Sequence, residues 1–182
     1  MPRLYRAVSL GLLLLAGSSA PALAQGLMTD LIKDIGELET KFVGLAKAMD
    51  TKYDWRPGAG VRSVSEVFLH VAGDNYVMPA AVGVDPDPAT GINMNDFKTV
   101  ATFEKKQLSQ ADMVVAIEKS FAHLKKAMAD SPEAKLGEDL KFFGQTMSRR
   151  SMWVGTTTHL HEHLGQMVAY ARSNGVVPPW SK

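Results

Sequence analysis

The sequence predicts an all-α protein, a four-helix bundle that follows an N-terminal signal peptide. Three observations support this fold class. Apolar residues recur at spacings of three and four over long stretches, helix-capping residues precede those stretches, and no alternating strand pattern of useful length is present. Four amphipathic helices joined by one long irregular connection are typical of a helical bundle.

The N-terminal residues are typical of a signal peptide. Arg3 and Arg6 provide a positive start, an apolar run follows over residues 7–16, and Ala22-Leu23-Ala24 fits the small-x-small rule of signal peptidase. The apolar run is shorter than the ~20 residues of a membrane-spanning helix, so cleavage is favoured over the alternative, a retained N-terminal anchor. We therefore expect an exported protein, periplasmic or secreted, without a stable membrane anchor.

This cleavage assigns residues 1–24 to the signal peptide and residues 25–182 to a single mature domain. Removing the two arginines of the signal changes the formal net charge from +1 to −1. Without a basic excess or a basic block, no nucleic-acid partner is expected. The chain has no cysteine, which excludes disulfides, a cysteine nucleophile, thiolate ligands, iron–sulfur clusters and a lipoprotein anchor.

The first two helices have clear signals. The first has one apolar stripe and should end near Asp50; the stripe comprises Met28, Leu31, Ile35, Leu38, Phe42, Leu45 and Met49. The second should begin at Ser63, because Ser63 and Glu66 form the S-x-x-E pattern of a capping box. A loop containing Pro86, Pro88 and Gly91 should follow, from about residue 82 to 96.

The third helix should run from about Ser109 to Met128, and a turn of helix around residues 102–106 is compatible with the pattern before it. Residues 131–147 are expected to be an irregular connection. The last helix should run from about Ser148 to Ser173, because Asn174-Gly175 is a C-terminal cap signal.

Helix geometry sorts the five histidines. His159 and His163 are four residues apart, so they project side by side from one helix face, the spacing of H-x-x-x-H metal ligands. Helical histidines at this spacing are also often solvent-exposed, so the pair alone leaves both possibilities open. Gly155 leaves room on the same face, and Gln166 continues it with a polar group. His161 points about 200° away from His159 and is expected at the surface.

His70 is the expected third ligand. It lies on the inward side of the second helix, and facing helices of a bundle direct such side chains toward a common centre. A single histidine on an apolar face is more often a hydrogen-bonded core residue than a ligand, which is the alternative for His70. His123 points away from the apolar stripe of the third helix and is expected at the surface.

These residues give the sequence a resemblance to a known family. The first part of the pattern is Tyr53-x-Trp55-Arg56-Pro57 followed by Arg62-Ser63-x-x-Glu66-x-x-x-His70. The second part is His159-x-x-x-His163-x-Gly165-Gln166-x-x-x-Tyr170-x-Arg172-x-x-Gly175-x-x-Pro178-Pro179. In this order the pattern resembles the DinB-like (DinB/YfiT) superfamily over essentially the whole mature chain, with the closer likeness to its exported uncharacterised members.

The resemblance implies an up-down-down-up four-helix bundle. It also implies a divalent metal ion, nickel or zinc, held by His70, His159 and His163. Where activity is known, some members are transferases or isomerases that use low-molecular-weight thiols, and others are regarded as metal-dependent hydrolases. The export signal departs from most relatives and separates this chain from the usual thiol pool.

Three imidazole ligands leave a metal position open for water or substrate, as in catalytic zinc sites. Asp74, Tyr76 and Gln166 are candidate groups around the ligands that orient them or carry protons. The leading hypothesis is a metal-dependent enzyme, a hydrolase or a thiol/group transferase, acting on a small molecule. The alternatives are a non-catalytic metal- or ligand-binding envelope protein and a metal-free structural protein. A homodimer is compatible with the pattern.

Overall fold

The structure is a computed structural model that describes residues 26–181, so the predicted signal peptide lies outside the described residues. The described chain is mostly helical and contains five α-helices and one two-stranded sheet. In chain order these elements are α1 (Leu27–Ala48), α2 (Val64–Ala80), α3 (Lys98–Glu104), α4 (Gln110–Ala129), β1 (Asp139–Phe142), β2 (Gln145–Ser148) and α5 (Arg149–Ser173). Among these residues, no helix is both long and apolar enough to cross a membrane.

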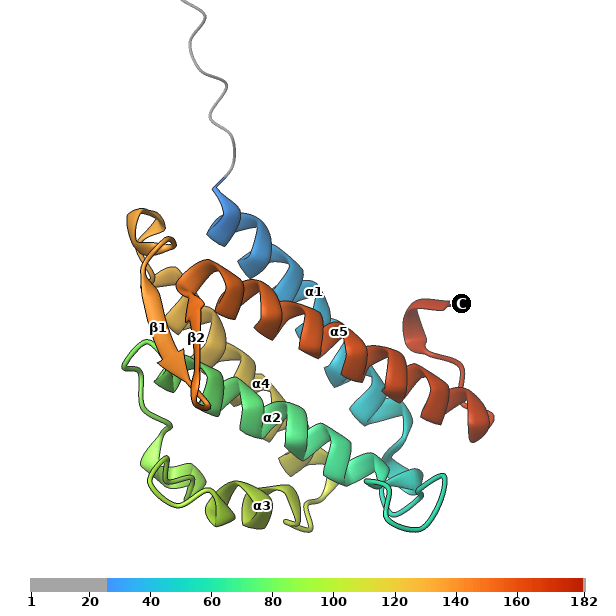
Figure 1. Cartoon of the computed structure of the whole chain (residues 1–182). Coiled ribbons are helices and arrows are strands. Elements are labelled where there is room, and N and C mark those ends of the chain that lie inside the picture. The colour runs from blue at the N-terminus through green and yellow to red at the C-terminus, as the bar shows by residue number, and fades with distance from the viewer. Residues whose placement is uncertain (1–25, 182) are drawn as a thin grey trace, which may run out of the picture.

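The four long helices lie side by side, with α1 and α5 running in one direction and α2 and α4 in the other (Figure 1). Contacts at the helix ends agree with these directions. The Gln110 side chain at the start of α4 donates to the carbonyl of Lys47 at the end of α1, and Met28 N at the start of α1 donates to Glu133 just after α4. Helices α1 and α2 each pack against both α4 and α5, so the order around the bundle is α1, α4, α2, α5.

The apolar stripes predicted for α1 and α4 form the centre of the core. Phe42 of α1 and Phe121 of α4 have no solvent exposure, and their ring centroids lie 5.9 Å apart. Burial of each such side chain stabilises the folded state by about 1.5–3 kcal/mol. Trp153 of α5 is also fully buried and donates its indole N–H to Ser131. This apolar packing holds the four helices in place.

The capping box predicted at the start of α2 is confirmed. Ser63 Oγ accepts from Glu66 N, and the Glu66 carboxylate accepts from Ser63 N at 2.7 Å. The preceding segment also holds this helix start, because Val64 N and Ser65 N donate to the carbonyls of Trp55 and Tyr53. The N-terminus of α2 is therefore held both by its own capping box and by hydrogen bonds to the preceding segment.

The other predicted helix ends agree with the structure to within about two residues. Ser109 and Ser148 are the N-caps of α4 and α5, each accepting a backbone N–H through its hydroxyl. The first helix ends at Ala48, close to the predicted Asp50. After α5, Gly175 adopts a left-handed conformation with φ 72°, as the Asn-Gly signal predicts.

The connection over residues 131–147 is not wholly irregular, which corrects the prediction. It contains an antiparallel hairpin in which Phe142 pairs with Gln145 across a two-residue turn. Both turn residues have positive φ, 48° at Phe143 and 75° at Gly144, as tight hairpin turns of this kind require. The short α3 occupies residues near the predicted turn of helix and packs against α2. The bundle therefore has a fifth helix and a hairpin in addition to the four predicted helices.

Candidate metal centre

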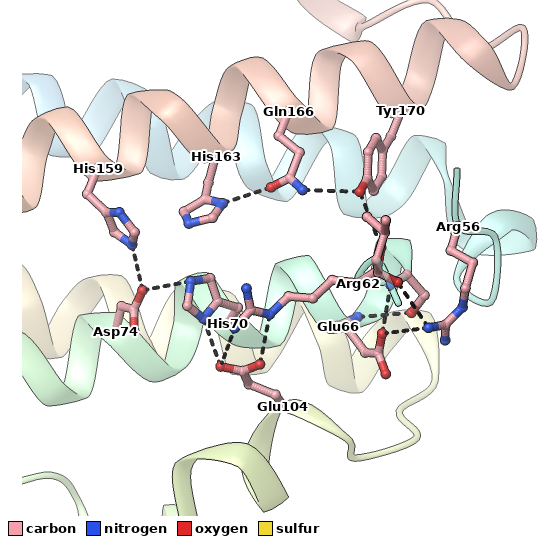
Figure 2. Close-up of polar contacts among 12 residues, drawn as sticks. Arg56, Arg62, Glu66, His70, Asp74, Glu104, His159, His163, Gln166 and Tyr170 are labelled. Carbon is pink, nitrogen blue, oxygen red and sulfur yellow. Dashed lines mark hydrogen bonds and ion pairs between the residues drawn. The ribbon is translucent and has the colours of Figure 1, made fainter. Parts of the chain in front are cut away.

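Four potential ligands meet where α2 and α5 face each other (Figure 2). His70 and Asp74 are one turn apart on α2, and His159 and His163 are one turn apart on α5. One donor atom from each of these four side chains lies within 4.8 Å of the others. The two i, i+4 pairs therefore project from opposite helices into one small volume.

The imidazole rings are close and nearly perpendicular to one another. The ring centroids of His70 and His163 are 4.6 Å apart, and those of His159 and His163 are 4.5 Å apart. Asp74 lies among the rings, with its Oδ2 2.7 Å from His159 Nε2 and 3.2 Å from His70 Nε2. Asp74 is thus a member of the cluster itself, closer to its centre than the outer position predicted for it.

The outer nitrogen of His70 contacts a carboxylate from α3. His70 Nδ1 is 2.8 Å from Glu104 Oε1, and Arg62 Nε donates to Glu104 Oε2 at 2.9 Å. Burial acts to raise the pKa of Glu104, but the hydrogen bonds from His70 and Arg62 lower it overall. Because an ionised carboxylate only accepts, it orients the His70 ring with Nδ1–H outward and Nε2 toward the cluster.

The outer nitrogen of His163 contacts an amide on its own helix. His163 Nδ1 is 2.8 Å from Gln166 Oε1, and Gln166 Nε2 donates to Tyr170 Oη at 3.1 Å. Burial lowers the pKa of His163, which favours the neutral imidazole that binds metals. The Gln166 contact leaves His163 Nε2 directed toward the cluster.

Within residues 26–181, His159 has no comparable outer partner. Its Nδ1 is 4.0 Å from Glu162, a side chain that is 79% exposed. Its Nε2 instead contacts Asp74, and this hydrogen bond raises the pKa of His159 against the opposing effect of burial. A proton on Nε2 of His159 therefore occupies a position where a metal ion would bind.

The donor set of the cluster could bind a metal ion. His70 lies between Glu104 at Nδ1 and Asp74 at Nε2, whereas a neutral imidazole has only one N–H to donate. A positive charge between His70 and Asp74 resolves this conflict. Tetrahedral zinc donors are about 3.4 Å apart, given Zn–N distances of about 2.1 Å. The donors here lie within 4.8 Å of one another, so the most widely spaced ones must draw closer, whereas the 2.7 Å contact between Asp74 Oδ2 and His159 Nε2 must lengthen. Three imidazoles and one carboxylate therefore fit a divalent metal ion in chemistry and nearly in position.

The positions of three other residues in the structure agree with those expected from the sequence. Gln166 is next to His163, as expected for a group around the ligands. His161 is exposed, and its Nε2 contacts Asp34 of α1. A Cβ added at Gly155 would meet no atom within 4 Å, which agrees with the open space predicted there.

Two predictions are corrected. Tyr76 lines a separate cavity of about 220 Å³ with Phe103, and no hydrogen bond joins it to the cluster among residues 26–181. His123 is not a surface residue: it is half-buried and packs against Tyr76 at a centroid distance of 5.0 Å, and its buried Nε2 has no hydrogen-bond partner in the part of the chain that the structure describes. The predicted direction relative to Phe121 holds, but Tyr76 packs on that side of α4, and Asp87 is near enough to act on the charge of His123.

Sequence reasoning missed Glu104 and the roles of Arg62 and Tyr170. Glu104 lies on α3, 34 residues after His70 in the sequence, and no helical spacing relates the two residues. Arg62 and Tyr170 belong to the pattern that carries the family resemblance. The signal that could have led to Glu104 is His70 itself. A metal-binding histidine needs a partner for its outer nitrogen, and a helix that packs over the second helix can supply one.

No family model matches the sequence, and no curated protein matches it. Solved structures with a similar fold include two DinB-like proteins. A DinB-like protein from Bacillus subtilis is 15% identical with a TM-score of 0.63, and the match covers 84% of this chain and 97% of the other. A DinB-like protein from Bacillus cereus is 16% identical with a TM-score of 0.66, and the match covers 85% of this chain and 97% of the other. The described chain therefore has the DinB-like fold over most of its length.

Proposed function

We propose that His70, His159 and His163, with Asp74 beside them, hold one divalent metal ion, and that the protein uses it as a metal-dependent hydrolase or group transferase on a small molecule. The observation that carries this proposal is the convergence of four donor atoms within 4.8 Å from two facing helices. The outer contacts of His70 and His163 support it, because both leave Nε2 free to bind the ion. The donor set suits zinc or nickel.

The chemistry depends on what occupies the fourth position. A divalent metal held by three imidazoles lowers the pKa of bound water toward ~7 or polarises a substrate oxygen or sulfur. The side chains of this site are partly exposed, 31% for His159 and 15% for Asp74, so the centre is accessible from solvent. In this function Asp74 would not bind the ion itself but would be placed to accept a hydrogen bond from a water or substrate at the open position.

A second candidate function is favoured by one observation. Asp74 Oδ2 already lies within 3.2 Å of two of the histidine nitrogens, as the fourth ligand of a closed tetrahedral site would. A closed site of four protein ligands is typical of structural metal sites. In that case the protein is a metal-binding envelope protein without catalysis.

Turnover separates these two functions. The metal-loaded protein is assayed on a panel of ester, amide and thiol-transfer substrates, alongside chelator-treated protein and the His159→Ala variant. The enzyme function predicts turnover that disappears in both controls. Turnover that is equal in all three samples contradicts it, and absence of turnover in a protein that holds one equivalent of metal favours the binding function.

We also propose export, a periplasmic or secreted location, and action on small molecules rather than nucleic acid, with a homodimer as the assembly. The signal-peptide pattern supports export, and the lack of a basic block supports action on small molecules rather than nucleic acid. Cell fractionation with N-terminal analysis of the recovered protein tests export. A mature N-terminus at Gln25 is expected, whereas an intact N-terminus in the cytoplasm contradicts the proposal. Light scattering tests the homodimer, which a monomer mass would exclude.

A further inference from the structure

A chain of hydrogen bonds connects His163 to the backbone at the start of α2 (Figure 2). It runs from His163 Nδ1 to Gln166 Oε1, from Gln166 Nε2 to Tyr170 Oη, and from Tyr170 Oη to the carbonyl of Arg62. The three side chains lie on one face of α5 because their spacings are three and four residues. The chain therefore joins the two helices that carry the metal ligands.

The last acceptor, the carbonyl of Arg62, fixes which group donates and which accepts at each step of this hydrogen-bond series. A backbone carbonyl only accepts, so Tyr170 donates its single hydroxyl hydrogen to Arg62 O, at 3.3 Å. The Tyr170 oxygen then accepts from Gln166, which must present its NH₂ group at 3.1 Å. The Gln166 carbonyl oxygen consequently faces His163, whose Nδ1 must carry a hydrogen.

The Arg62 carbonyl is itself held in place. It immediately precedes Ser63, the N-cap whose N–H donates to Glu66 and whose hydroxyl accepts from the first turn of α2. Tyr170 is only 7% exposed, and its ring packs edge-on against Trp55 at a centroid distance of 5.2 Å. Both ends of the Tyr170–carbonyl contact are therefore positioned by packing and capping that do not involve the cluster.

We infer that Tyr170 is a positioning residue that acts through Gln166 to fix the Nδ1–H tautomer of His163, leaving the Nε2 lone pair for the metal ion. The inference rests on the proposed metal site for its purpose, but the tautomer itself is a property of the metal-free protein. Which ring nitrogen of a histidine carries the proton is set by the hydrogen bond that the other nitrogen makes. Glu104 fixes the His70 tautomer with a charge, whereas Tyr170 and Gln166 fix that of His163 without one.

The test measures the tautomer and the metal affinity separately. Long-range ¹H–¹⁵N NMR of metal-free protein with ¹⁵N-labelled imidazoles, at a pH of about 8, reports which nitrogen of His163 is protonated, because burial lowers the pKa of His163 below its ordinary value of about 6.5. The wild-type protein should show only the Nδ1–H form. Tyr170→Phe keeps the ring on Trp55 but frees the Gln166 amide to rotate, so both tautomers should be present. Its zinc affinity should fall on the order of 10-fold.

A rescue variant separates positioning from a structural role. In the double variant Tyr170→Phe/Gln166→Glu, a carboxylate that can only accept faces His163, so the Nδ1–H form and the zinc affinity should return. Tyr76→Phe is the matched control, because Tyr76 lines the separate cavity, and it should change neither measurement. An unchanged tautomer in Tyr170→Phe, or no return in the double variant, overturns the inference. A wild-type protein that shows the Nδ1–H form but binds no zinc supports the inference and overturns the proposed function instead.

Discussion

The α1–α4 and α2–α5 interfaces lie on opposite sides of the same bundle and differ in what holds them together. At the α1–α4 interface, Phe42 and Phe121 are fully buried and in contact. At the α2–α5 interface, three histidines and one aspartate face one another and remain partly exposed. The apolar interface stabilises the fold, and it thereby holds the polar interface in a geometry that the polar side chains would not adopt alone.

The largest expected effect is a loss of stability caused by a substitution in the apolar α1–α4 interface. Phe121→Ala removes a ring that contacts Phe42 and leaves a cavity, which should lower the free energy of unfolding by about 3–5 kcal/mol. Denaturant unfolding of metal-free protein measures this loss. Val115→Ala, on the exposed side of α4, is the control and should change stability by no more than about 0.5 kcal/mol. Equal effects of the two variants would contradict the assignment of the core.

The next largest effect is a loss of zinc affinity caused by a substitution in the polar α2–α5 interface. His163→Ala removes a proposed ligand, so the zinc affinity should fall by more than the ~10–100-fold that loss of an outer partner causes. The stability of the metal-free protein should change much less than in Phe121→Ala, because His163 makes its contacts in a half-exposed polar site. Calorimetric zinc titration and denaturant unfolding provide the two values. His161→Ala is the matched control on the same helix, and a similar affinity loss there would contradict the site.

A substitution at the N-cap of α2 should have smaller effects on both quantities, the stability of the fold and the zinc affinity of the site. Ser63→Ala removes the hydroxyl that caps α2 and should cost about 1 kcal/mol of stability. Because Ser63 follows the carbonyl that accepts from Tyr170, this variant should also weaken zinc binding. Ser109→Ala removes the equivalent cap of α4, and it should lower stability by a similar amount while leaving zinc binding unchanged. Identical zinc affinities of the two variants would show that the cap of α2 has no influence on the site.

The smallest effect concerns pH. Burial lowers the pKa of His123 below its ordinary value, against the opposing effect of Asp87. The unfolded chain therefore binds this proton more readily, and the His123 contribution to stability is lost as the pH falls through about 6.5, its ordinary pKa. His123→Phe removes that loss and keeps a ring against Tyr76, so its stability should decline less on acidification. Unfolding of chelator-treated proteins at several pH values measures the difference, and parallel profiles would contradict the burial of His123.

The same contrast explains which features the sequence could predict. Helix stripes and caps are local patterns, so the helix starts at Ser63, Ser109 and Ser148 were predictable. The hairpin was missed because its strands are only four residues long and its turn is Phe143-Gly144 rather than an Asn-Gly or Asp-Gly pair.

Within the site, the predicted histidines come together because helical spacing fixes the direction of each side chain. Glu104 was not predictable in this way, since only the packing of α3 against α2 brings it to His70. Tyr76 is predicted from the sequence, together with Asp74, as a candidate group around the ligands. It lies two residues further along α2, however, which turns it by about 200° toward α3 and α4.

The central claim is that the side chains between α2 and α5 hold one metal ion. Elemental analysis of the purified protein after equilibration with zinc and removal of free metal tests this claim most directly. One equivalent of zinc should remain in the wild-type protein, and none should remain in a His159→Ala/His163→Ala variant whose helical content is unchanged. Absence of bound zinc and of bound nickel in the wild-type protein, or equal retention by the variant, would contradict the metal site.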